Sequence, residues 1–311
     1  MYNPKDLIEI LAGNVRKTRS PFATPRFLTN RWHKGLSIPR DGEALLFTGL
    51  MYQFVPFIES VTHYLEKYED TKAARLMRYG IYQPKRLSGL GIAMITPRKE
   101  RRKADEILQN ISRILVKSGV DFCYKPELDF YTGILLYDLG DQDGFVNHAR
   151  FVAESLKKAG IRKLITVDPH TTYALKVLFP KYTGIHFDVQ VYFELVDFEG
   201  GNGEQRVTLH DPCFYGRYLE LSDAPRKALA KLHVECVDVP ACGAFTSCCG
   251  GPAESVSPSL SRGVMERRVE ELKKTGEPIV AMCPICLGQL RKSGAEVRDL
   301  SEVMARCAGL H

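Results

Sequence analysis

The stretch Ile279-Val280-Ala281-Met282-Cys283-Pro284-Ile285-Cys286 decides the fold class, because it joins a short apolar run to a Cys-x-x-Cys pair. The run 279–282 predicts a buried strand, and a proline directly after Cys283 is typical of the first turn of a helix. Both cysteines are therefore expected where a strand enters a helix. There they face free amides and the positive end of the helix dipole.

Strands and helices alternate along most of the chain. Further strands are expected at 44–47, 163–167, 206–209 and 234–239, and helices at 146–158, 225–232 and 257–274, with one starting at Pro56 and one at Thr96-Pro97. This alternation predicts an α/β fold with largely parallel sheets.

Two features suggest how the chain is divided. Residues 1–40 are basic, aromatic and weakly periodic, so we expect an N-terminal arm that lies along another surface, with Phe22, Phe27 and Trp32 at a subunit interface. A glycine-rich break around 199–203 separates a first domain, 41–199, from a second domain, 200–311.

Composition and sequence pattern argue against a nucleic-acid-binding, secreted or membrane-spanning protein. The chain has 311 residues, 44% hydrophobic and 26% charged, and a net charge of +6 that is spread thinly. The sequence has no basic stripe interleaved with aromatic residues, so a nucleic-acid partner is not expected. The start lacks the layout of a secretory signal, and the longest apolar stretch, near 90–95, is too short to span a membrane. A cytoplasmic location is therefore expected.

Nine cysteines are many for a reducing compartment, where clustered thiols usually indicate metal or redox chemistry. Neighbouring side chains diverge, so the adjacent pair Cys248-Cys249 suits an inorganic core with several irons better than a single ion. A tetrahedral zinc on four thiols, with a structural role, is the alternative. The expected ligands are Cys213, Cys248, Cys249, Cys283 and Cys286; the remaining cysteines, Cys123, Cys236, Cys242 and Cys307, form no pattern and are expected to be core or surface thiols.

The two domains repeat each other. The segment 156–160, a strand and Asp168-Pro169 match 272–276, a strand and Cys283-Pro284. The same comparison aligns 130–133 with 247–250 and 48–52 with 211–215. In the first domain the five ligand positions are occupied by Leu50, Tyr131, Thr132, Asp168 and Thr171. The fold is thus duplicated, and only the second domain is expected to bind metal.

The runs His-Asp-Pro-Cys (210–213), Cys-Cys-Gly-Gly (248–251) and Cys-Pro-Ile-Cys (283–286) resemble the cysteine-rich CCG domain of heterodisulfide reductases and their relatives. The resemblance implies two pseudo-symmetric α/β CCG domains, the first of them degenerate and carrying a helical insertion. It also implies one non-cubane [4Fe-4S] cluster on Cys213, Cys248, Cys249, Cys283 and Cys286, which meets a thiol or disulfide directly.

By the same resemblance, the chain would be an oxidoreductase subunit of a heterodisulfide-reductase-like complex of sulfur metabolism. Its substrate would be a free or carrier-bound thiol or disulfide. Because the chain has no ferredoxin-type cysteine run, electrons would pass through other iron–sulfur or flavin subunits. Two alternatives stay open: a non-catalytic scaffold stabilised by zinc or a cluster, and the iron–sulfur subunit of a glycolate- or lactate-oxidase-type dehydrogenase.

Three polar residues are candidates for acid–base work. His210 and Asp211 precede the first cluster cysteine, and His170 lies at the vacant site of the first domain. Histidine titrates near neutrality and could exchange a proton with a thiol held between the domains. For His170, and for Asp168 beside it, the simpler interpretation is that they satisfy a polar loop.

Overall fold

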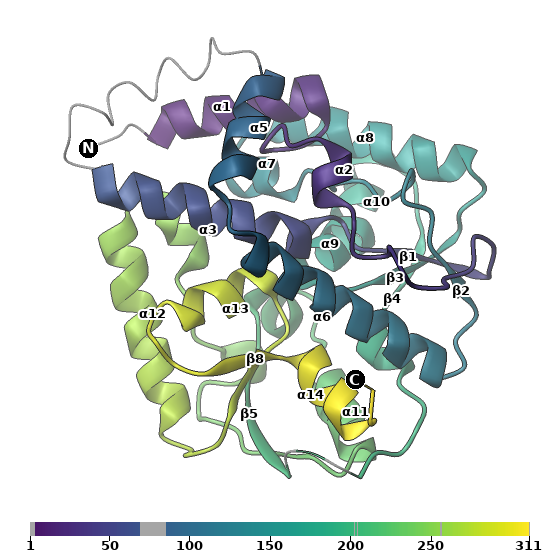
Figure 1. Ribbon diagram of the computed structural model, residues 1–311, viewed down its shortest axis with the longest axis vertical. Coiled ribbons are helices and arrows are strands. Elements are labelled where there is room, and N and C mark those ends of the chain that lie inside the picture. Colours follow the sequence, from purple (N-terminus) through teal and green to yellow (C-terminus); the bar gives the residue numbers. More distant parts are fainter. Residues whose placement is uncertain (1–3, 69–84, 202, 204, 256, 311) are drawn as a thin grey trace.

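A computed structural model describes residues 4–68, 85–201, 203, 205–255 and 257–310 (Figure 1). Within these residues the chain forms two parallel four-stranded sheets with helices packed around them, which confirms the α/β prediction. The elements up to residue 201 are α1 (Pro4–Thr18), α2 (Arg26–Thr29), β1 (Ala44–Phe47), α3 (Met51–Tyr68), α5 (Lys85–Ile95), α6 (Arg98–Lys117), β2 (Phe122–Cys123), α7 (Ile134–Asp138), α8 (Gln142–Lys158), β3 (Lys163–Thr166), α9 (Pro169–Tyr173), η2 (Ala174–Leu178), α10 (Phe179–Thr183), β4 (Asp188–Val191) and η3 (Tyr192–Leu195).

The later elements build the second sheet. They are β5 (Arg206–His210), η4 (Phe214–Tyr218), α11 (Asp223–Lys231), β6 (Glu235–Cys236), η5 (Gly243–Phe245), η6 (Gly251–Ser255), α12 (Pro258–Lys273), β7 (Ile279–Ala281), α13 (Pro284–Arg291), β8 (Val297–Asp299) and α14 (Leu300–Cys307). The strand order is β2-β1-β3-β4 in the first sheet and β6-β5-β7-β8 in the second, so the two sheets share one topology.

Alternation along the strands gives the first sheet two apolar faces. Leu45 pairs with Leu164, and Leu46 pairs with Ile165. Leu45 and Leu164 join the hydrophobic cluster that includes α8, whereas Leu46 and Ile165 join the one that includes α6. Because successive side chains point to opposite faces, helices can cover both sides of the sheet.

Local geometry supports the internal repeat. Asp168 and Cys283, which the repeat aligns, are the N-cap residues of α9 and α13. Gly133 and Gly250 both have a left-handed backbone, with φ of 90° and 87°. Both halves also contain a Thr–Asp hydrogen bond, with the two residue types in opposite positions. Thr48 donates to the carboxylate of Asp129 at 2.6 Å, and at the aligned positions Thr246 donates to the carbonyl of Asp211 at 2.7 Å.

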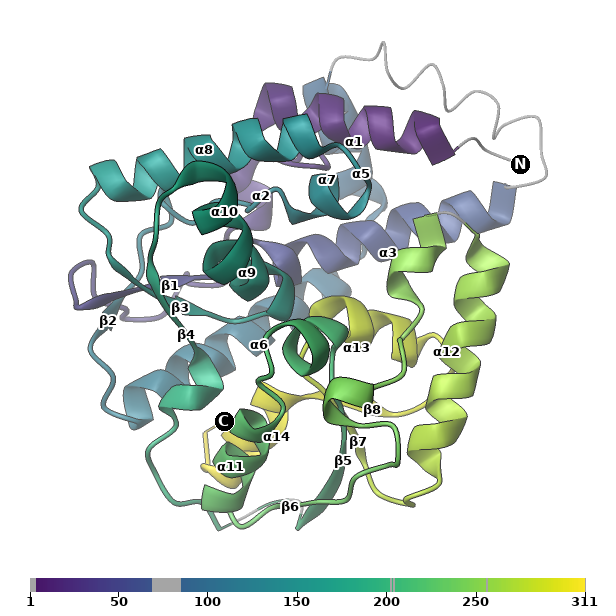
Figure 2. The same cartoon turned by 180° about the vertical axis from the view of Figure 1, so that it is seen from behind.

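The two halves pack against each other (Figure 2), and one tyrosine of each half contacts the other half. Tyr52 of α3 donates its hydroxyl to Asp299 of the second half at 2.6 Å. Tyr215, at the aligned position, reaches back to Thr172 of the first half at 3.4 Å. Helix α6 packs against α14, and α3 packs against α13. The carboxyl ends of β1 and β3 thereby lie opposite the cysteine loops.

The structure corrects the expected arm. Trp32 is fully buried in the chain's own core, and its Nε1 donates to the Tyr124 hydroxyl at 3.1 Å. Phe22 is also buried, with its ring 5.6 Å from that of Phe54. Of the three expected interface aromatics, only Phe27 is exposed. The segment also contains helix α1, which buries Ala12 and Val15 in the core of the first half. Weak periodicity in the sequence thus hid a segment that packs against its own chain.

A second correction concerns α3, which begins at Met51 and contains Pro56 in its interior. The helix starts early because β1 leads into it through the short turn Thr48–Leu50, where Leu50 has a φ of 62°. The aligned Cys213 stands at the same point after β5, directly before the π-helical turn η4.

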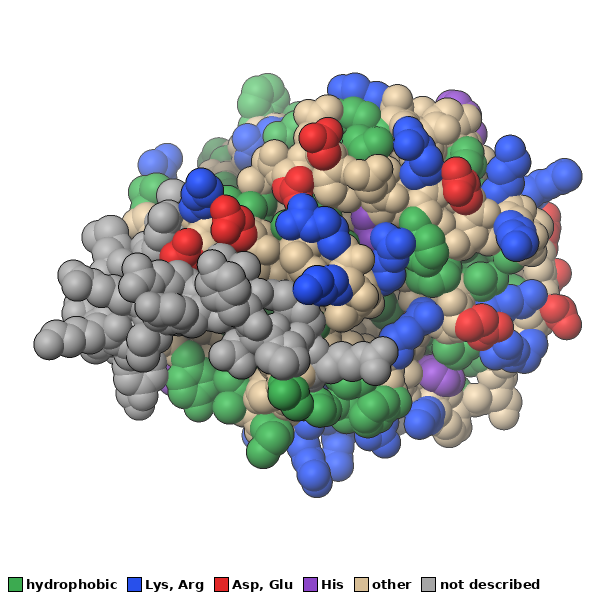
Figure 3. All heavy atoms as spheres, turned by 90° about the horizontal axis from the view of Figure 1, so that it is seen from above, with side chains coloured by type: hydrophobic (Ala, Val, Ile, Leu, Met, Phe, Trp, Pro, Cys, Tyr) green, Lys and Arg blue, Asp and Glu red, His purple; other side chains and the backbone are tan. Residues whose placement is uncertain are grey.

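The surface carries mixed side chains. On the end of the molecule that Figure 3 views, Lys and Arg side chains are scattered among acidic and hydrophobic ones and form no single stripe. None of the helices in the described ranges has the length and apolar character needed to cross a bilayer.

Candidate metal centre

The five expected ligands come from three loops at the carboxyl end of the second sheet. Cys213 follows β5, Cys248 and Cys249 lie between η5 and η6, and Cys283 and Cys286 open α13. In parallel sheets such strand-end loops meet at one edge. Cys249, Cys283 and Cys286 are buried, whereas Cys213 and Cys248 are partly accessible from solvent.

The thiols contact one another. Cys249 is hydrogen-bonded with Cys248 and Cys286, and Cys286 is hydrogen-bonded with Cys283. Cys213 interacts electrostatically with Cys283 and Cys249. The five cysteines thus interact with one another, and their role as the ligands of one cluster stays a prediction.

The group favours two thiolates. Hydrogen bonds from Cys248 and then Cys286 hold the pKa of Cys249 well below its ordinary value. Burial raises the pKa of Cys283, but Cys286 and His170 outweigh it and lower that pKa to about 6. The start of α13 lies at Cys283 and adds the positive end of its dipole. Thiolates are the form in which cysteine binds metal.

Two histidines flank the thiols from opposite halves. The Nδ1 atom of His170 lies 3.8 Å from the Cys283 sulfur and 3.7 Å from an Asp168 oxygen. Burial lowers the pKa of His170, but Cys283 and Asp168 raise it well above its ordinary value. His210, Cys249 and Cys286 place their ligand atoms within 4.8 Å of one another.

Asp211 is held in an ion pair. Arg226 donates to both of its carboxylate oxygens, at 2.9 and 2.8 Å, and the Gly243 amide donates to one of them at 2.8 Å. Because its carbonyl accepts from Thr246 as well, Asp211 ties the Cys213 loop to the segment that leads into Cys248. This contact favours a positioning role for Asp211.

Arg268 of α12 was not predicted, although it is one of the largest fully buried side chains. Its Nε atom donates to His210 Nδ1 at 3.1 Å, and its Nη1 atom donates to the Ala241 carbonyl and to Glu271. No periodicity marks this arginine in the sequence, since its partners other than Glu271 come from distant segments of the chain. Only the expectation that a buried charge needs partners could have found it.

The equivalent site of the first half is closed by packing. Leu50, Tyr131, Thr132, Asp168 and Thr171 are all buried. Asp168 caps α9 by accepting from the His170 and Thr171 amides, and the Tyr131 hydroxyl accepts from the Leu135 amide at 2.7 Å. Over the described part of the chain, no metal-binding group of His, Cys, Asp and Glu forms there.

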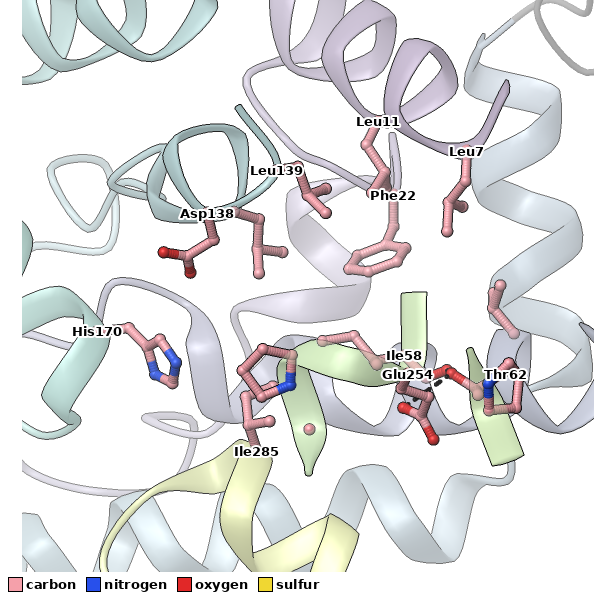
Figure 4. A pocket seen from close by; sticks show the side chains of 15 residues that line it. Leu7, Leu11, Phe22, Ile58, Thr62, Asp138, Leu139, His170, Glu254 and Ile285 are labelled. Carbon is pink, nitrogen blue, oxygen red and sulfur yellow. Dashed lines mark hydrogen bonds between the residues drawn. The ribbon is translucent and has the colours of Figure 1, made fainter. Parts of the chain in front are cut away.

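A cavity of about 160 Å³ lies between the halves, next to the thiols (Figure 4). Its walls are mostly aliphatic or aromatic, from α1, α3, α7 and the turn at Phe22. His170 and Asp138 lie at one end, and Glu254 and Thr62 lie at the other. Two of its lining residues lie beside the thiols: His170 contacts the Cys283 sulfur at 3.8 Å, and a Cβ atom on Gly251 would lie 3.5 Å from the Cys249 sulfur.

The donor set suits an iron–sulfur cluster better than a single zinc ion. Five sulfur donors exceed the four that a tetrahedral zinc takes, and two of them are adjacent in the chain. Soft thiolates suit iron–sulfur cores. The residues present therefore fit an iron–sulfur cluster.

Comparisons with known proteins agree with this chemistry. Residues 207–291 match the family described as CCG, cysteine-rich domain. The chain is 30% identical over 222 residues to a subunit of the dihydromethanophenazine:CoB–CoM heterodisulfide reductase of Methanosarcina mazei, covering 64% of this chain and 54% of that protein. It is 29% identical to a probable membrane-anchored ferredoxin of Chromohalobacter salexigens, covering 64% of this chain and 33% of that protein.

A third relative is the probable iron-sulfur-binding oxidoreductase FadF of Bacillus subtilis, 24% identical over 200 residues, or 60% of this chain and 28% of that protein. This chain thus spans about a third to a half of the curated relatives it matches.

Proposed function

We propose that this chain is the iron–sulfur redox subunit of a heterodisulfide-reductase-like complex. It would hold a single cluster on Cys213, Cys248, Cys249, Cys283 and Cys286, a non-cubane [4Fe-4S] cluster by resemblance. The observation that carries the proposal is the convergence of these five thiols at one sheet edge, beside a pocket. When bound, the cluster would supply reversible one-electron chemistry next to a sulfur substrate.

The proposed reaction interconverts a disulfide and its thiols. Reducing one disulfide consumes two electrons and two protons and yields two thiols. The electrons would come from, or return to, another iron–sulfur or flavin subunit. His170 lines the pocket and contacts Cys283, so it is the proposed group for moving a proton at Nδ1. A cytoplasmic location belongs to the same proposal.

The pocket suggests the kind of substrate. Its apolar walls favour an aliphatic arm, and its polar ends provide partners for a sulfur group and for a head group. An apolar cavity of about 150 Å³ can hold benzene, so this pocket should take a chain of about six carbons.

Binding of 1-alkanols is expected to test the pocket without involving sulfur or the cluster. From ethanol to hexanol, each methylene should increase affinity about fourfold, because burying one methylene contributes about 0.8 kcal/mol, and the gain should then level off. Isothermal titration calorimetry measures the series. Leu139→Asp should abolish the chain-length dependence, and the exposed Leu87→Asp should keep it. A flat series for the unmodified protein would reject the pocket and leave the cluster proposal standing.

Iron content is the direct test of the cluster. Anaerobically purified or reconstituted protein is expected to contain about four irons and as many acid-labile sulfides per chain, with a redox-active electron paramagnetic resonance signal. About eight irons would contradict our interpretation of the first half as vacant. A colourless protein with one zinc would support the alternative, a non-catalytic scaffold subunit.

A second candidate function follows from the likeness to FadF, whose name specifies an iron-sulfur-binding oxidoreductase and no sulfur substrate. In that case the same cluster would pass electrons between partner subunits of a dehydrogenase of the glycolate- or lactate-oxidase type. Adding thiols or disulfides distinguishes the two functions. A changed resonance signal supports direct sulfur chemistry, and an unchanged one supports the electron-relay role.

A further inference from the structure

The buried contact between Arg268 and His210 determines where the histidine carries its proton. Arg268 Nε lies 3.1 Å from His210 Nδ1. A guanidinium has only donors and stays protonated in proteins. Nδ1 must therefore present its lone pair, so the proton of the neutral ring resides on Nε2.

That proton points toward sulfur. His210 is buried, and its Nε2 atom has no nitrogen or oxygen partner within the described residues. A ring nitrogen of His210 and the Cys249 and Cys286 sulfurs lie within 4.8 Å of one another. Because Nδ1 faces Arg268, Nε2 is the nitrogen left to face sulfur. A side-chain hydrogen bond also joins His210 to Cys249. The ring is thus placed to donate an N–H to the Cys249 thiolate.

The same contact argues against His210 as a metal ligand. A ligating histidine usually donates its second ring nitrogen to a carboxylate, carbonyl or water. Here the second nitrogen faces a donor, and the nitrogen that faces the sulfurs carries the proton.

Arg268 is itself held in place. It donates to the Ala241 carbonyl at 2.9 Å and to Glu271 at 2.6 Å, and its remaining nitrogen lies 3.4 Å from Thr246 Oγ1. These partners fix the guanidinium plane from three sides, so Nε keeps its direction toward His210.

We propose that Arg268 is a positioning residue that fixes His210 as a hydrogen-bond donor to the sulfur of Cys249, and so raises the reduction potential of the cluster. This rests on the proposed function. A donor that draws negative charge from a ligating sulfur stabilises the reduced state, which carries one more electron.

The first test is a redox titration of loaded protein, followed by electron paramagnetic resonance. His210→Leu and Arg268→Gln should each lower the equilibrium constant for reduction about tenfold, or about 59 mV for one electron. The double variant should equal His210→Leu, because Arg268 acts through the histidine. Arg267→Gln, which removes the same charge from an exposed position on the same helix, should leave the potential unchanged. Additive shifts, or no shift, would overturn the proposal.

The second test needs no iron. Nitrogen-15 magnetic resonance of zinc-loaded, diamagnetic protein should find His210 protonated at Nε2 and bare at Nδ1, and Arg268→Gln should mix the two tautomers. A proton on Nδ1 in the unmodified protein would reject the inference, whatever metal is bound. The expected tautomer in a protein that never assembles iron would instead reject the proposed function and leave the role of Arg268 intact.

Discussion

Replacing Cys286 with serine is expected to remove nearly all iron from the protein. Cys286 is buried and shares hydrogen bonds with Cys249 and Cys283, so its sulfur lies at the centre of the thiol group. A serine oxygen is a hard, mostly protonated donor that holds iron–sulfur cores poorly. Iron and acid-labile sulfide analysis of anaerobically prepared protein measures the loss, and Cys283→Ser should behave in the same way.

Cys307 offers a matched control. It is as buried as Cys286, at 4% exposure, but lies in the hydrophobic core on α14. Cys307→Ser should cost stability through its buried hydroxyl and still retain the cluster. If both variants kept all of their iron, our assignment of the ligands would be wrong. If both lost it, burial and not ligation would explain the effect.

The sequence was sufficient for the features that depend on local patterns. The strand before Cys283 and the helix after it were both predicted, because an apolar run and a proline at the first helical turn report local geometry. The repeat was also predictable: Asp168 and Cys283 stand at equivalent N-caps, and the strand orders of the two sheets agree.

Features that depend on distant contacts were not predictable. Arg268 reaches His210 across 58 positions, and Trp32 reaches Tyr124 across 92. No spacing rule links such pairs, and isolated charged or aromatic residues usually lie at surfaces or interfaces. The expectation for Trp32 therefore failed for the same reason that Arg268 was missed: the contact partners come from other elements of the fold.

If the first half binds no metal, as we propose, its hydrogen bonds explain how the duplicated scaffold can persist. Thr48 and its amide, the Gly49 amide and the Tyr124 hydroxyl all donate to the buried Asp129, on the loop that leads to the vacated ligand positions. Hydrogen bonds thus hold together loops that metal would otherwise join. The first half then contributes His170 and one wall of the pocket to the site of the second half.

The last prediction concerns the ion pair that holds the cysteine loops of the second half. Asp211→Ala is expected to lower the free energy of unfolding by about 3 kcal/mol, because it removes a buried carboxylate and leaves the partly buried Arg226 with a single acidic partner, Asp238. It should also decrease cluster content, since Asp211 binds the Gly243 amide and Thr246 ahead of Cys248. Urea unfolding followed by circular dichroism gives the first quantity, and iron analysis gives the second.

Asp238→Ala is the matched control, because Asp238 binds the same arginine from a more exposed position, with 37% of its side chain accessible. An exposed ion pair contributes about 0–1 kcal/mol, so this variant should unfold at nearly the same urea concentration and keep its iron. Equal destabilisation by the two variants would mean that the charge of Arg226, and not the position of Asp211 between the loops, is what matters. A stable Asp211→Ala protein with full iron content would show that the thiols hold their geometry without this support.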